Sequence, residues 1–133
     1  KQLGKKQPQH VILHSAWLDV TGEDPRYEQI EKLDPMLGVQ GAQRLGKMWA
    51  KNAGVKNYIV SPLYGELHDI GQITLFVGTA ELLYVDAQLL REKAQEQGVS
   101  INYFEYKNMN HVFPVFPIPE AKKAFQELVA IIQ

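Results

Sequence analysis

Three short apolar runs, separated by stretches of helical periodicity, most constrain what this chain can fold into. The runs cover residues 10–14, 73–77 and 101–106. The first two consist mainly of aliphatic and aromatic residues and fit strands that are buried on both faces. The third alternates weakly and is rich in aromatic residues, which also favours a strand.

Helical patterns follow each of the three runs. Apolar residues recur every three or four positions over 39–50, 83–96 and 120–132, with Gly54 and Gly98 as stop signals and Pro119 at a first helical position. Strand, helix, strand, helix, strand, helix predicts an α/β protein in which parallel strands are joined by right-handed crossovers and helices cover the sheet. The outer edge of the first strand would be an exposed pairing surface that something should cover.

The length and composition bound the class of protein. A chain of 133 residues that is 45% hydrophobic suits a single domain, and a net charge of −1 offers no footprint for nucleic acid or an anionic membrane. No apolar run approaches the roughly 18 residues of a membrane span. The absence of cysteine excludes disulfides and thiolate chemistry, and the cytoplasm is the default location. Residues 1–9, which begin with Lys1, are typical of a linker, so we expect this domain to be the C-terminal segment of a longer one.

An acid and a base stand at the ends of two predicted strands. Glu81 follows the run 73–77, and His111 lies in the loop after 101–106, between the apolar residues Met109 and Val112. The carboxyl ends of parallel strands are where α/β sheets place their chemistry. Taken alone, Glu81 would more often be a glutamate that stabilises a helix start, and His111 a residue of a surface loop. Asp86 is a competing acid, which we expect to be solvated or structural because it falls inside the helix predicted over 83–96.

A nucleophile for this pair is missing from the sequence. The serines are Ser15, Ser61 and Ser100, and none lies in a Gly-x-Ser-x-Gly sequence. We also expect no metal and no nucleotide cofactor. His10 and His14 would lie roughly 13 Å apart along a strand, and no Gly-x-Gly-x-x-Gly sequence occurs.

Four blocks in a fixed order carry a family resemblance. They are Leu-His-Ser-Ala-Trp-Leu-Asp-Val-Thr at 13–21, Val-Ser-Pro-Leu-Tyr-Gly-Glu-Leu at 60–67, Val-Gly-Thr-Ala-Glu within 77–86, and Met-Asn-His-Val-Phe at 109–113. Together they resemble the C-terminal part of the hormone-sensitive-lipase-like esterases, the bacterial acetyl-esterase type of α/β-hydrolase. Ala16 and Asn108 stand where the family usually has proline and glycine, and the acid is glutamate rather than the more frequent aspartate.

The resemblance implies a function and its residues. It implies a three-layer fold that holds the last three parallel strands of the hydrolase sheet, with a cap-like loop and helix within 15–70. It implies a serine carboxylesterase acting on small, short-chain esters without a cofactor. Glu81 would be the triad acid and His111 the general base, while Trp17, Val112 and Phe113 would contact substrate. Trp49, Tyr58 and Tyr64 could line a hydrophobic site or anchor loops to the core.

The missing serine and oxyanion loop imply a partner. The chain would supply acid and base but no nucleophile, and would be inactive alone. The missing N-terminal half of the hydrolase, or a second subunit, would cover the first strand. The alternative is a non-catalytic α/β binding or dimerisation module derived from a hydrolase.

Overall fold

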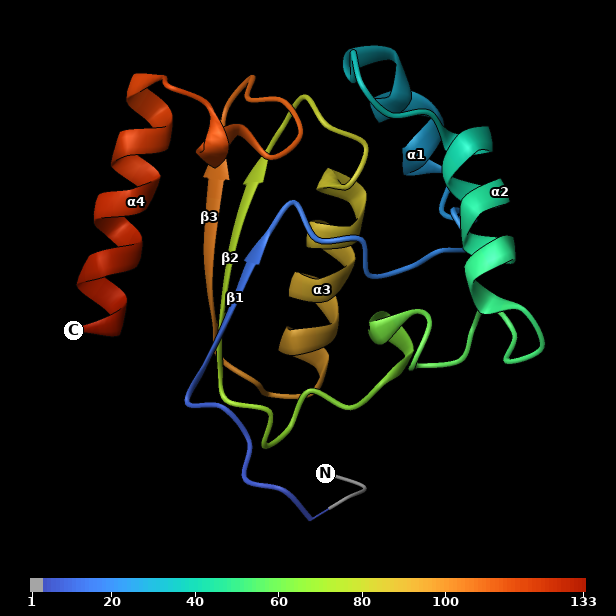
Figure 1. Cartoon of the computed structure of the whole chain (residues 1–133), viewed down its shortest axis with the longest axis horizontal. Helices are drawn as coiled ribbons and strands as arrows, with labels where there is room; N and C mark the ends of the chain where they lie inside the picture. Colours follow the sequence, from blue (N-terminus) through green and yellow to red (C-terminus); the bar gives the residue numbers. More distant parts are fainter. Residues whose placement is uncertain (1–3) are drawn as a thin grey trace.

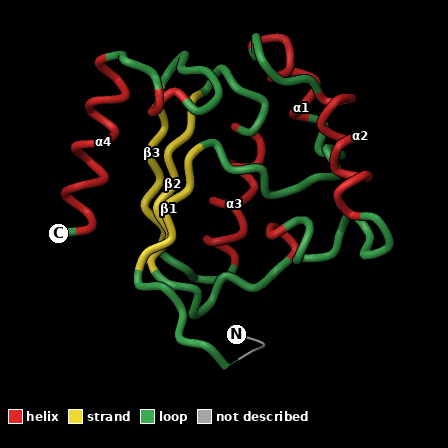
Figure 2. The backbone as a smooth tube through the Cα atoms, in the orientation of Figure 1, coloured by secondary structure: helices red, strands yellow, loops and turns green. Residues whose placement is uncertain are grey.

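A three-stranded parallel sheet forms the centre of the molecule, which a computed structural model describes over residues 4–133 (Figures 1 and 2). Strands β1 (His10–His14), β2 (Gln72–Gly78) and β3 (Ile101–Tyr106) lie in the order β1-β2-β3. The register places Val11 opposite Ile73, and Ile73 opposite Ile101. The predicted α/β class with parallel strands is therefore confirmed.

Two helices cover opposite faces of the sheet, as Figure 1 shows: α3 (Tyr84–Glu96) on one side and α4 (Pro119–Ile132) on the other. Because side chains alternate along a strand, β2 serves both layers. Its residues Ile73, Leu75 and Val77 share a core with α3, and Phe76 shares a second core with α4. The predicted three-layer arrangement is thus confirmed, and β2 is its most deeply buried strand.

The segment between β1 and β2 contains two further helices. The short helix α1 (Arg26–Ile30) continues into a 3₁₀ turn (Glu31–Leu33), and α2 (Val39–Ala50) follows. Both pack against α3 through a cluster in which Tyr27 and Val39 meet Val85. A 3₁₀ turn at Pro62–Tyr64 precedes β2, and another at Phe113–Val115 precedes α4.

Strand β1 differs from the sequence-based expectation of burial on both faces. Val11, Ile12 and Leu13 are only half-buried. The reason is that, within residues 4–133, β1 pairs only with β2, so its outer edge has no neighbouring strand. Among the helices of the same residues, none has the length and apolar character needed to cross a membrane.

Candidate active site

The loops that follow β2 and β3 interlock at the carboxyl edge of the sheet. The amide of Ala80 donates to the carbonyl of Met109 at 3.0 Å, and the amide of Asn108 donates to Thr79 Oγ1 at 2.8 Å. Gly78 makes this approach feasible, because a Cβ at that position would overlap the carbonyl group of Met109. The two predicted site residues are thereby held on adjacent loops.

Glu81 lies at the centre of this junction, with a side chain that is fully buried. Its Oε1 accepts hydrogen bonds from the Ser15 hydroxyl at 2.7 Å and from the Gly78 amide at 2.8 Å. Its Oε2 lies 2.9 Å from Nδ1 of His111. The carboxylate therefore receives one contact from the end of each of the three strands or their loops.

Burial and hydrogen bonding act in opposite directions on this carboxyl. Burial raises the pKa of Glu81 above its ordinary value, and the Ser15 hydroxyl, the Gly78 amide and His111 each lower it. The balance leaves the pKa raised. Hydrogen bonds from donors stabilise the ionised form, which is the form that can accept from an imidazole N–H.

His111 is held less deeply than its partner. About 20% of its side chain is exposed. The neighbouring residues Asn108 and Val112 adopt left-handed backbone conformations, with φ of 60° and 50°. The Val112 amide donates to Ser15 Oγ at 2.9 Å, which fixes the loop directly after the imidazole. One ring nitrogen thus faces a buried carboxylate while part of the ring remains open.

The three predicted substrate-binding residues have different surroundings. Trp17 is half-buried, and its indole N–H donates to the carbonyl of Asp19 at 3.1 Å. Val112 is half-buried beside His111. Phe113 is fully buried, with its ring 4.6 Å from that of Tyr106, so its side chain has no surface to offer a substrate in the described chain.

Ser15 and Ser61 have hydrogen-bond partners other than His111. Ser15 donates to the acid rather than to the base. Ser61 is fully buried and bonds to the carbonyl of Val55, and Ser100 precedes β3, at the opposite end of that strand from the His111 loop. Within residues 4–133, no serine hydroxyl bonds to His111.

Asp86 is a second buried carboxylate, five residues beyond Glu81, and its role is structural. Its Oδ1 accepts from the amides of Leu18 and Asp19, both at 2.7 Å, and its Oδ2 accepts from the Tyr27 hydroxyl at 2.8 Å. Of the two alternatives expected from sequence, solvated or structural, the second is correct. Asp19, in the loop that Asp86 holds, accepts from the Thr21 amide at 2.9 Å.

Two polar residues near the site were not found by sequence reasoning. Ser15 bridges Glu81 and Val112, and Asp34 Oδ2 accepts from the amide of Leu82 at 2.6 Å. The available signal for Ser15 was its position directly after β1, at the same edge of the sheet as Glu81. Asp34 lies in an irregular segment and carried no comparable signal.

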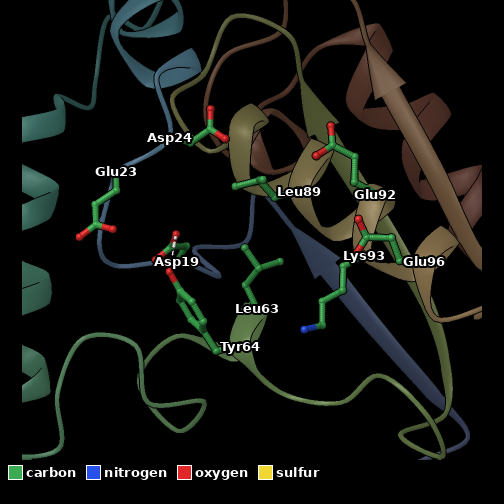
Figure 3. Close-up of a pocket in the computed structure, with 9 residues that line it drawn as sticks. All are labelled: Asp19, Glu23, Asp24, Leu63, Tyr64, Leu89, Glu92, Lys93 and Glu96. Carbon is green, nitrogen blue, oxygen red and sulfur yellow. Dashed lines mark hydrogen bonds between the residues drawn. The ribbon is translucent and has the colours of Figure 1, made fainter.

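An acidic hollow lies elsewhere, over the outer face of α3 (Figure 3). Its volume is about 540 Å³, and most of its polar lining is carboxylate: Asp19, Glu23, Asp24, Glu92 and Glu96. Arg26 bridges Asp24 and Glu92 at 2.9 and 2.6 Å. In the part of the chain that the structure describes, no group of three or more His, Asp or Glu side chains could hold a metal ion.

The three-layer fold, with its parallel sheet between helices, is that of an α/β-hydrolase. The sequence profile of the family described as "alpha/beta hydrolase fold" matches residues 1–115, and the chain belongs to this family.

Comparison with known proteins adds relatives within that class. The chain is 31% identical over 142 residues to an esterase of Acinetobacter venetianus, covering 96% of this chain and 43% of the relative. It is 23% identical to an acetyl-hydrolase of Streptomyces hygroscopicus, covering 100% of this chain and 45% of the relative. The chain thus spans less than half the length of these relatives.

Solved structures agree. An esterase/lipase from an uncultured bacterium superposes with a TM-score of 0.84 at 27% identity, over 92% of this chain and 42% of that one. A hormone-sensitive lipase from a metagenome library superposes with a TM-score of 0.91 at 22% identity, over 98% and 45% of the two chains, which shows the shared fold. The predicted resemblance to the C-terminal part of a hormone-sensitive-lipase-like hydrolase is confirmed.

Proposed function

We propose that this chain supplies the acid and the base of a serine carboxylesterase that hydrolyses short-chain esters. The observation that carries the proposal is the 2.9 Å contact between buried Glu81 and part-exposed His111. An ionised carboxylate can only accept a hydrogen bond, so the proton between the two residues lies on Nδ1. The other imidazole nitrogen is then unprotonated and able to act as a base.

The reaction follows from this tautomer. His111 takes the proton of a serine hydroxyl as its oxygen attacks the ester carbonyl, and then gives that proton to the departing alcohol. A water molecule then attacks the acyl-enzyme in the same two proton-transfer steps, which releases the carboxylic acid product and restores the serine. Glu81 remains ionised and stabilises the imidazolium that forms in each half-reaction.

The nucleophilic serine and the oxyanion hole come from outside this chain. The missing N-terminal half of the hydrolase is the proposed source, and its strands would lie beside β1. Support comes from an apolar groove of about 870 Å³ next to β1, lined in part by Val11, Leu13, Leu18 and Leu67. The substrate would lie near Trp17 and Val112, and we assign buried Phe113 to anchoring the His111 loop. A cytoplasmic location stays a prediction.

The alternative, a non-catalytic binding or dimerisation module, is supported less well. A module without catalysis has no use for a part-exposed imidazole that contacts a buried carboxylate. A structural carboxylate can bond to backbone amides and a hydroxyl instead, as Asp86 does. Glu81 is fully buried and has three polar partners.

The test measures hydrolysis of p-nitrophenyl acetate and p-nitrophenyl butyrate by the complete polypeptide that carries this chain. His111→Ala should lower kcat by about 10⁴-fold or more, and Glu81→Gln by about 10⁴-fold. The control is His68→Ala, which removes an exposed histidine and should leave the rate unchanged. Full activity in His111→Ala would overturn the proposal.

The 133-residue chain alone should show negligible esterase activity, because an imidazole without a nucleophile cannot form the acyl-enzyme. Robust hydrolysis by the chain alone, abolished in His111→Ala, would show that a nucleophile lies within it.

A further inference from the structure

We infer that Ser15 is a positioning residue of the proposed acid–base pair: its hydroxyl orients Glu81 and the His111 loop at the same time. The inference rests on the proposed function. It goes beyond that function because it gives the first strand a part in the chemistry, whereas the acid and base come from the loops after β2 and β3.

The Ser15 hydroxyl acts both as a donor and as an acceptor. It donates to Glu81 Oε1 at 2.7 Å and accepts from the Val112 amide at 2.9 Å. These partners are 66 and 97 residues away along the chain. One oxygen atom therefore joins the end of β1 to the acid and to the residue directly after the base.

The backbone of Ser15 is shaped for this contact. The residue lies one position beyond β1, and its amide still donates to the carbonyl of Phe76 at 3.0 Å. Its φ of 45° lies in the left-handed region, which non-glycine residues rarely adopt. The side chain is 4% exposed. A buried serine in a left-handed conformation thus directs both of its side-chain hydrogen bonds at the site.

The hydroxyl also acts on the ionisation of the acid. Among the groups that lower the pKa of Glu81 against the effect of burial, the Ser15 hydroxyl comes first, ahead of the Gly78 amide and His111. His111 is the only titratable side chain that contacts Glu81 in the described residues. The neighbouring carboxylates Asp34 and Asp86 bond instead to backbone amides.

Loss of the hydroxyl would therefore leave the carboxylate poorly stabilised. Gly78 would remain the only donor to Oε1, and the Val112 amide would lose its acceptor. Glu81 would then take up its proton at a higher pH, and a protonated Glu81 cannot stabilise an imidazolium.

The test uses the complete polypeptide with ¹³C-labelled glutamate, in Ser15→Ala and Ser15→Gly. Ser15→Gly removes the hydroxyl but tolerates the left-handed backbone, so it remains informative if Ser15→Ala folds poorly. In both variants the ¹³C titration of the Glu81 carboxyl should move to higher pH, by about a tenfold change in its ionisation constant. The value of kcat/KM for p-nitrophenyl acetate should fall by about 10- to 100-fold.

Ser61→Ala is the matched control. Ser61 is also a buried serine with one donated and one accepted hydrogen bond, to the carbonyl of Val55 at 2.6 Å and from the amide of Val20 at 3.0 Å. Its loss should cost comparable stability, yet it should move neither the Glu81 titration nor the activity of the folded fraction.

Two readouts separate this inference from the proposed function. An unchanged Glu81 titration in both Ser15 variants overturns the inference, even if the wild type is an esterase that needs His111. If the wild type hydrolyses no ester, the proposed function fails, and the titration still decides whether Ser15 positions Glu81.

Discussion

The buried carboxylates of Glu81 and Asp86 lie five residues apart but have different partners. Glu81 faces an imidazole that is partly open to the surface. Asp86 faces two backbone amides and a tyrosine hydroxyl. Burial raises the pKa of both, for Asp86 to about 7. Under the proposed function, the partner of each carboxylate, rather than its depth, decides which of the two would take part in chemistry.

The raised pKa of Asp86 predicts a pH dependence of stability. An aspartate in the unfolded chain ionises at about pH 4, whereas Asp86 in the folded chain ionises at about pH 7. Between these two pH values the folded state therefore binds one proton more than the unfolded state does. The stability contributed by neutral Asp86 is therefore complete below this window and is lost as the pH rises through 7. Asp86→Asn cannot ionise, so its free energy of unfolding should rise relative to wild type across the window.

Urea unfolding of both proteins at several pH values between 4 and 8 measures this difference. The asparagine can still accept from Leu18 and Asp19 through its carbonyl oxygen. A constant difference between the two proteins at all pH values would contradict the titration of Asp86.

Gly78 allows a close backbone approach rather than a special turn. A Cβ there would lie 2.5 Å from the carbonyl carbon of Met109, in a backbone segment that the amide of Ala80 holds by a hydrogen bond. Gly78→Ala should destabilise the protein by about 1–3 kcal/mol, as overpacking does. It should also separate the Glu81 and His111 loops, so that the proposed esterase activity of the complete polypeptide falls as well. If Gly78→Ala were as stable and as active as the wild type, the close approach of the two loops would not be needed for either property.

At the scale of elements, α2 is held by a close contact rather than by a wide interface. A Cβ on Gly46 would lie 2.6 Å from the carbonyl oxygen of Val20 and 2.7 Å from its Cβ. The helix thus packs its buried face directly on the loop after β1. Gly46→Ala should detach α2, lower the unfolding temperature, and speed amide hydrogen exchange in α2 while β2 stays protected.

Gly41→Ala is the control within the same helix. A methyl group at Gly41 meets nothing within 4 Å, so alanine should stabilise the helix by up to about 1 kcal/mol through its higher propensity. Equal effects of the two substitutions would mean that propensity, and not the contact with Val20, governs this helix.

The elements themselves were predicted well because each rests on local periodicity. The bounds of β1, α2 and β3 agree with the predicted ranges 10–14, 39–50 and 101–106. Strand β2 is one residue longer at each end than predicted, and α3 and α4 differ by one residue at their first position. The pairing of Glu81 with His111 followed from the carboxyl ends of parallel strands and from a family resemblance. Ser15 and Asp86 were missed as links because their partners lie 66 to 97 residues away in the case of Ser15, and 59 to 68 in the case of Asp86. The hydrophobic periodicity of a single helix or strand covers only neighbouring residues, so it carries no information on contacts between residues this far apart.

At the scale of the whole molecule, two apolar surfaces lie uncovered in the described chain. One is the groove beside β1, of about 870 Å³. The other is the outer side of α2, where Leu45, Met48 and Trp49 are 59%, 63% and 72% exposed. Together with the open edge of β1, these are surfaces against which further parts of a protein could pack. They fit the proposal that further sheet strands and cap elements complete the fold.

The open edge of β1 gives the most direct test of that proposal. In the chain alone, amides of β1 that point away from β2 should exchange their hydrogens rapidly, because they have no strand to pair with. In the complete polypeptide the same amides should be strongly protected. Amides of β2, which lies between two strands, should be protected in both and report that the shorter chain is folded. Equal exchange of β1 in both proteins would make it a true edge of the sheet. Protection of the chain alone that grows with its concentration would instead identify a second copy as the cover.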